Sequence, residues 1–203
     1  MAYIVFEGPE GSGKSTQARL LASRLNAVLT REPGGTALGA KLRALLLSVD
    51  EAPIGARAEV LLMAADRAQH MEDVVAPALG EGRHVVADRS VYSSMAYQGA
   101  ARGLGIDAVA ELNQWALDGR WPDLAILLDI TVEAAASRLE RSLDRLESEG
   151  DSFHQRVATA YRQMAAHNSE QWLVVSADQP VEIVAEKVWA GVVERLGLTE
   201  AEA

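Results

Sequence analysis

The chain has 203 residues, of which 49% are hydrophobic, and it contains no cysteine. This length suits one domain with at most a small lid and argues against two full domains. Acidic residues outnumber basic residues by 29 to 19, and the resulting net charge of −10 argues against a nucleic-acid partner. Because no apolar run approaches the roughly 18 residues that cross a bilayer, and because the lack of cysteine suits a reducing compartment, we expect a cytoplasmic protein with no membrane partner.

The first element is an apolar run, Tyr3–Glu7, which is predicted to be a buried strand. A segment with the phosphate-loop pattern G-x-x-x-x-G-K-[ST] follows, and a helix is expected from Lys14 onward. In such a loop the backbone N–H groups surround a phosphate, the lysine reaches the β- and γ-phosphates, and the serine hydroxyl can ligate Mg²⁺. We expect Lys14 to be solvent-accessible in the empty site. The predicted ATP-binding residues are Gly8, Pro9, Glu10, Gly11, Ser12, Gly13, Lys14, Ser15 and Thr16.

The rest of the chain alternates between short apolar runs and longer amphipathic stretches. Strands are predicted at Tyr3–Glu7, Ala27–Thr30, His84–Ala87, Leu124–Asp129 and Trp172–Ser176. Helices are predicted at residues 14–25, 38–47, 57–79, 107–117, 132–148, 153–168 and 181–196. This order indicates an α/β fold of the P-loop NTPase type, in which helices flank a doubly wound, five-stranded parallel sheet.

Asp88 and Arg89 come at the carboxyl end of the third predicted strand. Ligands of a parallel sheet bind at the carboxyl ends of its strands, so both side chains are expected in the cleft beside the phosphate loop. The carboxylate can hold Mg²⁺ together with Ser15, and the guanidinium can hold a second phosphate. A local ion pair that closes the sheet is the alternative reading of this pair.

Met63 and Arg67 are four residues apart on the long third predicted helix and share a face. One could lie on a flat ring while the other hydrogen-bonds the edge of that ring. From spacing alone, however, the more common case is a methionine in the core and an arginine paired with Asp66 or Glu59 on a solvated surface.

Three arginines, Arg138, Arg141 and Arg145, recur at spacings of three and four before a polar stretch. They can line one side of a helix in a lid, at about residues 138–152, that closes over the phosphates. The alternative is a solvated helix whose acidic residues balance the arginines.

Several blocks of sequence resemble the thymidylate kinase family, and the resemblance covers nearly all of the chain. The phosphate loop is shared with many ATPases and is not diagnostic. The blocks specific to the family are R-E-P-G-G-T at 31–36, A-A-D-R-A-Q-H at 64–70 and A-Y-Q-G at 96–99. The resemblance implies a single nucleoside monophosphate kinase domain spanning residues 1–203, which transfers the γ-phosphate of ATP to dTMP, with Mg²⁺ as cofactor and a homodimeric assembly.

The resemblance also implies individual roles. Arg67 would hydrogen-bond the thymine edge, Arg43 and Arg89 would hold the acceptor phosphate, and Tyr97 would lie against the deoxyribose. The implied dTMP-binding residues are Glu10, Glu32, Arg43, Met63, Arg67, Arg89, Ser94, Tyr97 and Gln98. The implied catalytic residues are Lys14, Arg89, Arg138, Arg141 and Arg145, and the implied metal-binding residues are Ser15 and Asp88. Adenine would bind near residues 176–178.

Two positions depart from common patterns of the family. Met63 stands where a phenylalanine usually stacks on thymine, and Gly11 stands where some members carry an arginine in the phosphate loop. Members with the present form of the loop use lid arginines instead, and we expect Arg141 to be the one that reaches the transition state. Two other functions stay open: a kinase of the same fold acting on another nucleoside monophosphate or metabolite, and a nucleotide-dependent switch.

Overall fold

The computed structural model describes residues 1–49, 52–138 and 144–198. Its centre is a parallel sheet of five strands in the order β2-β3-β1-β4-β5. The strands are β1 (Tyr3–Glu7), β2 (Val28–Arg31), β3 (Val85–Asp88), β4 (Leu124–Asp129) and β5 (Trp172–Ser176). The predicted doubly wound α/β sheet is confirmed, and each strand lies within one residue of its predicted position.

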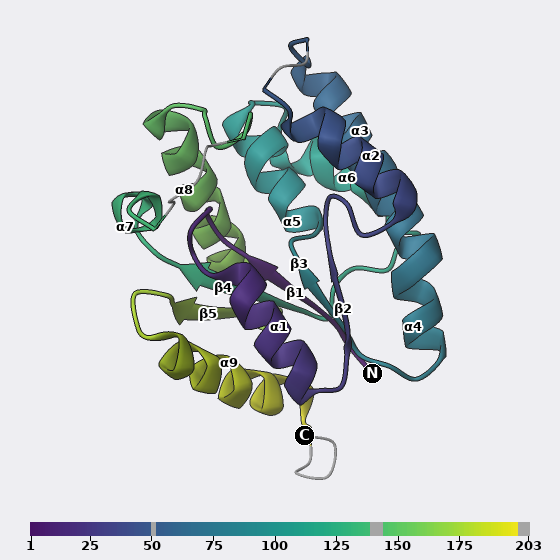
Figure 1. The fold of residues 1–203 in the computed structure, drawn as a ribbon, viewed down its shortest axis with the longest axis vertical. Helices are drawn as coiled ribbons and strands as arrows, with labels where there is room; N and C mark the ends of the chain where they lie inside the picture. Colours follow the sequence, from purple (N-terminus) through teal and green to yellow (C-terminus); the bar gives the residue numbers. More distant parts are fainter. Residues whose placement is uncertain (50–51, 139–143, 199–203) are drawn as a thin grey trace.

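The first strand is buried on both faces, and its side chains alternate between two cores. Tyr3 and Val5 belong to one apolar cluster, whereas Ile4 and Phe6 belong to another on the opposite face. Figure 1 shows α1 (Lys14–Arg24) and α9 (Val181–Leu196) side by side over one face, where they bury the second cluster. This double burial explains why the strand is a continuous apolar run and not an alternating one.

Of the remaining helices, those that carry Val91, Tyr97 and Phe153 bury the first cluster on the other face, whereas the short helix that carries Ala135 adds to the second cluster. Two π-helical segments, η1 and η2, interrupt or extend the α-helices. The bounds are α2 (Ala37–Leu47), α3 (Ala56–His70), η1 (Met71–Val75), α4 (Ala76–Gly80), α5 (Val91–Ser94), η2 (Met95–Ala101), α6 (Ile106–Ala116), α7 (Val132–Ala136) and α8 (Asp151–His167). In these described ranges no helix combines the length and hydropathy needed to span a membrane.

Two helix predictions need correction. The helix predicted over 132–148 ends at Ala136, and the described residues 144–148 form turns. The Asp144 carboxylate accepts hydrogen bonds from the backbone N–H groups of Leu146 and Glu147, at 2.9 Å each, and this local bonding competes with a helix. The second error is an omission: the helical stretch formed by α5 and η2 was not predicted, because its serines and glycine have poor helix propensity.

Candidate active site

The phosphate loop connects β1 to α1 at the point where the sheet reverses its strand order. Gly13 has a φ of 89° and caps α1, so the first turn of the helix directs its free N–H groups toward the loop. Gly11 has a φ of 78°, and a Cβ at this position would lie 2.2 Å from the carbonyl oxygen of Ala135 in α7. Both conformations require glycine, and the second leaves no room for the arginine that some phosphate loops carry here.

Lys14 is not accessible, which corrects the expectation from the sequence. Its side chain is only 5% exposed, and its ammonium group donates a 2.7 Å hydrogen bond to the carbonyl oxygen of Pro9 and a 3.4 Å bond to the Ser12 hydroxyl. Burial lowers the pKa of Lys14, with a further contribution from Arg89. The Lys14 ammonium thus lies against a main-chain oxygen and a hydroxyl group of its own loop.

The two residues predicted to bind a metal lie together beside this loop. The Ser15 hydroxyl donates to a carboxylate oxygen of Asp88, although the two residues are 73 positions apart in the sequence. Ser15 opens α1, and Asp88 ends β3, the strand next to β1. Mg²⁺ is commonly held by one or two such protein oxygens together with the phosphates of the nucleotide, so this pair fits the metal of an ATP complex.

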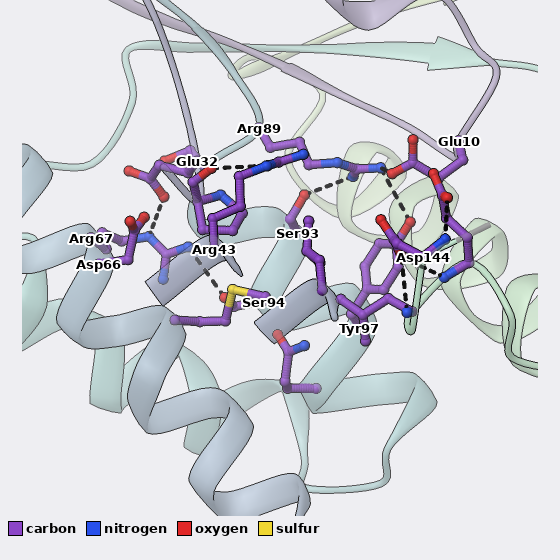
Figure 2. A pocket seen from close by; sticks show the side chains of 17 residues that line it. Glu10, Glu32, Arg43, Asp66, Arg67, Arg89, Ser93, Ser94, Tyr97 and Asp144 are labelled. Atoms are coloured by element: carbon purple, nitrogen blue, oxygen red, sulfur yellow. Dashed lines mark hydrogen bonds and ion pairs between the residues drawn. The ribbon is translucent and has the colours of Figure 1, made fainter. Parts of the chain in front are cut away.

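Arg89 lines two cavities: a cleft beside the phosphate loop, called here the phosphate cleft, and a second cavity, which Figure 2 shows. Its backbone has a φ of 73°, which is unusual for a residue other than glycine. Its guanidinium forms an ion pair with Glu10 and donates to the hydroxyl groups of Ser93 and Tyr97, at 2.9 and 3.2 Å. Burial opposes the charge, but the nearby Glu10 carboxylate and tyrosine oxygens raise the pKa of Arg89 well above its ordinary value. The arginine therefore stays cationic. In the described residues it pairs with Glu10, and the alternative in which it pairs with Asp88 is not observed.

Beneath Arg89 lies a carboxylate that the sequence analysis missed. Glu7 is fully buried and accepts hydrogen bonds from the Ser90 backbone N–H and from the hydroxyl groups of Ser93 and Tyr161, at 2.7 to 2.9 Å. Burial raises its pKa, and the positive charge of Arg89 counteracts that rise. Because Ser93 and Tyr161 also accept from Arg89, Glu7 supports the arginine through two hydroxyl groups. The sequence signal that could have identified Glu7 is a glutamate at the end of an apolar strand.

Arg67 is 2% exposed, so the solvated surface suggested by spacing alone is wrong. Its Nε donates to Glu32 at 2.8 Å, its Nη2 donates to the Ser94 hydroxyl at 3.2 Å, and its Nη1 donates to the side-chain oxygen of Asn113. Asn113, on α6, was another residue that the sequence analysis missed. These contacts hold the guanidinium from three sides, and its remaining N–H groups can serve a ligand.

Glu32 connects Arg67 to a buried histidine. One carboxylate oxygen pairs with Arg67, and the other lies 2.8 Å from Nδ1 of His70, whose Nε2 lies 2.7 Å from the Thr30 hydroxyl. Burial by itself would raise the pKa of Glu32, but Arg67 and His70 outweigh it and hold the pKa below its ordinary value. The carboxylate is therefore a fixed anion at the wall of the cavity.

All nine residues predicted to bind dTMP line one cavity, although they come from the phosphate loop and from several separate elements. In Figure 2, Arg67 and Glu32 lie at one end of this cavity, and Arg89 and Glu10 lie at the other. Met63 is 8% exposed and packs with Leu46 and with Leu146 from the turn at 145–148. The cavity thus has Arg67 and Glu32 at one end, an apolar wall at Met63, and Arg89 and Glu10 at the other end.

The two predicted lid arginines that the structure describes, Arg138 and Arg145, do not lie on one helix. Arg138 donates to the carbonyl oxygen of Ala177 at 3.1 Å, beside the position expected for adenine, and it also lines the phosphate cleft. Arg145 donates to the carbonyl oxygen of Leu46 at 2.7 Å and pairs with Glu59 at 2.8 Å. Arg141 lies outside the described residues.

A phosphate loop at the reversal point of a parallel sheet, joined through Arg89 to a second cavity that holds buried arginines, defines a P-loop kinase for a small phosphorylated acceptor. Comparison with known proteins is more specific. The family model described as thymidylate kinase matches residues 6–188. The chain belongs to the thymidylate kinase family.

Individual relatives agree along the whole chain. A thymidylate kinase of Halothermothrix orenii is 45% identical over 92% of this chain and 94% of its own length. One from Exiguobacterium is 41% identical over 96% of this chain and 95% of its own length. The crystal structure of thymidylate kinase from Ehrlichia chaffeensis superposes with a TM-score of 0.78 at 29% identity, covering 94% of this chain and 98% of the other. The family and the ATP-dependent dTMP kinase activity predicted from the sequence are thereby confirmed.

Proposed function

We propose that the nine predicted residues in the lining of the cavity bind dTMP and that the phosphate loop binds ATP. Lys14 and the arginines would then carry the transfer of the γ-phosphate that gives dTDP and ADP. The observation that supports this assignment most is the overlap of two cavities. The acceptor cavity and the phosphate cleft share Glu10, Glu32, Arg43 and Arg89. A monophosphate bound at the cationic end of one cavity would therefore meet a triphosphate bound in the other.

The shared residues suit an in-line transfer between two anions. The acceptor phosphate is largely ionised at neutral pH, since the second pKa of a phosphate monoester is about 6, and no general base is required. What the reaction needs is alignment and neutralisation of charge. Arg89 and Arg43 would hold the acceptor phosphate, while Lys14 would leave Pro9 to contact the transferring group.

Mg²⁺ is part of the proposal as the ion bound to the donor phosphates. Ser15 and Asp88 would hold it, directly or through water, because their oxygens already lie within hydrogen-bonding distance of each other. The ion would neutralise charge on the phosphates during transfer. The Ser15 hydroxyl could keep donating its hydrogen to Asp88 while a lone pair of its oxygen faces the metal.

The proposal is tested by measuring ADP release with a panel of acceptors: dTMP, dUMP, dCMP, dAMP, dGMP and no acceptor. We expect dTMP to give the highest kcat/KM and the reaction without acceptor to be negligible. Another preferred monophosphate would reassign the cavity, and ADP release independent of any acceptor would indicate a switch or ATPase. Substitution of Asp88 by asparagine should raise the Mg²⁺ concentration needed for half-maximal activity.

We further propose a homodimer formed through α2, α3 and α6, which lie side by side. Trp115 on α6 is 84% exposed, and Leu61 on α3 is 56% exposed, which is a costly arrangement for an isolated chain. A second copy of the chain would cover both. Sedimentation of the wild-type protein should give twice the chain mass, and Trp115→Arg combined with Leu61→Glu should give the monomer. Residence in the cytoplasm stays a prediction from composition.

A further inference from the structure

Behind the base end of the acceptor cavity lies a buried carboxylate that does not itself line the cavity. Glu59, on α3, has no exposed surface, and its three partners come from two other segments. Gln98, on η2, donates from Nε2 at 2.8 Å, and Arg102, the C-cap of η2, donates two N–H groups at 3.3 and 3.4 Å. Arg145, in the turn at 145–148, pairs with Glu59 at 2.8 Å. Of these partners, Gln98 also lines the acceptor cavity.

We propose that Glu59 is a positioning residue that fixes the side-chain amide of Gln98 with its oxygen toward the bound base, and so makes the pocket select a pyrimidine that carries a hydrogen on N3. This inference rests on the proposed binding of dTMP in this cavity. A carboxylate can only accept hydrogen bonds, so the NH₂ end of the amide must face Glu59. Within the described ranges, no donor meets the Gln98 oxygen, which leaves it for a ligand.

The chemistry of the two pyrimidines makes this orientation selective. Thymine presents N3–H as a donor between two carbonyl groups, whereas cytosine presents an unprotonated N3 acceptor beside an amino group. An amide oxygen accepts from the first and opposes the second. A site built around one hydrogen bond rejects the analogue that cannot make it far more strongly than an apolar wall does.

The substitution Glu59→Gln should reverse the orientation. Its new amide has one oxygen, which the guanidinium groups of Arg102 and Arg145 would attract, so its NH₂ group would face Gln98. Gln98 would then turn its own oxygen toward residue 59 and its NH₂ group toward the base. We expect the preference for dTMP over dCMP, measured as the ratio of kcat/KM, to fall at least about tenfold. The KM for ATP should stay within about twofold.

Three variants separate positioning from simple destabilisation. Glu59→Asp keeps an acceptor-only group and should retain the preference within about threefold, whatever its melting temperature. Gln98→Ala alone should abolish the preference for dTMP over dCMP. The double variant Glu59→Gln, Gln98→Ala should show the same preference as Gln98→Ala, because Glu59 acts only through Gln98. Glu149→Gln is the matched control: it removes the other carboxylate paired with Arg102, at 2.6 Å, and should leave the preference unchanged.

Four results would overturn the inference: an unchanged preference in Glu59→Gln, equal losses in Glu59→Gln and Glu59→Asp, additive losses in the double variant, or an unchanged preference in Gln98→Ala. The last result decides the matter even if Glu59→Gln does not fold. Failure of the proposed function is distinguishable, since the wild-type protein would then not prefer dTMP in the first place.

Discussion

The acceptor cavity and the phosphate loop meet at Arg89, but the partners that fix their cationic side chains differ in origin. In the cavity, Arg67 is fixed by side chains from three other segments, Glu32, Ser94 and Asn113. In the loop, Lys14 contacts a main-chain oxygen and one hydroxyl group, both from the loop itself. The difference teaches that Arg67 is held in place by packing between distant segments, whereas Lys14 is held by contacts within a single loop.

The largest effect should come from the loop. Lys14→Ala removes the cation that would contact the transferring phosphate, and we expect kcat to fall at least about a thousandfold. Because the hydrogen bonds of the ammonium group within the described residues stay inside the loop, the melting temperature should change little. The measurement is ADP release at saturating dTMP together with thermal unfolding. Retention of most of the activity by a normally folded variant would show that the loop has been misassigned.

A comparable loss in kcat, also about a thousandfold, is expected on removal of the lid arginine that reaches the transition state. Arg138 and Arg145 both have main-chain partners elsewhere, so Arg141 remains our first choice. Single alanine substitutions at the three positions, compared at saturating substrates, check this. If none of the three lowers kcat more than a few-fold, the lid arginines do not take part in the chemistry.

On the acceptor side, Arg67→Ala should change both binding and stability, unlike Lys14→Ala. Loss of a charged donor to the base costs about 1.5–3 kcal/mol, which should raise the KM for dTMP roughly 10- to 150-fold. The buried Glu32 would also lose its arginine partner and keep only His70, and breaking such a buried pair costs about 3–5 kcal/mol of stability. The KM for ATP should not change. Arg24→Ala, which breaks an exposed ion pair with Glu186, serves as the control.

The cavity should also contribute to acid sensitivity. The pKa of Glu32 is lower in the folded protein than in the unfolded chain, so its ionised form stabilises the fold above the unfolded pKa of about 4.3. This contribution is lost as the pH falls through the folded pKa. We therefore expect the melting temperature to drop below about pH 4, and to drop less steeply in Glu32→Gln. Identical pH profiles for the two proteins would contradict a stabilising role for this carboxylate.

The smallest effect is expected at the apolar wall. Met63→Phe offers a flat ring to the base, and offset stacking contributes about 0.5–1.5 kcal/mol. Met63 also packs against Leu46 and Leu146, so part of this gain will be offset by adjustment of the core. The KM for dTMP should fall by a few-fold at most, with the KM for ATP unchanged. A large increase in the acceptor KM would mean that the wall has no room for a ring.

The sequence predicted the parts of the site that depend on local pattern. The five strands and the phosphate loop follow from apolar runs and glycine spacing, and the acceptor residues followed from the family resemblance. The side-chain partners were not predictable, because Glu7, Glu59 and Asn113 meet the site through packing between distant segments. Spacing alone favoured a solvated surface for Arg67. In the structure this side chain is instead buried on α3, where it pairs with Glu32. The turns at 144–148 depend on local side-chain bonding that a helical charge pattern conceals.

The ion pairs within the empty cavity also bear on how the acceptor is found. Arg67 and Arg89 already have carboxylate partners, Glu32 and Glu10, so their fields are largely cancelled beyond contact distance. The chain as a whole carries a net charge of −10 and repels a nucleotide dianion. Long-range steering is therefore unfavourable, and if Arg89 holds the acceptor phosphate as proposed, that phosphate must compete with Glu10 for the guanidinium. Moderate ionic strength, which screens charges over about 10 Å at 0.1 M, should then speed the encounter with dTMP, the reverse of the usual behaviour of phosphate-binding proteins.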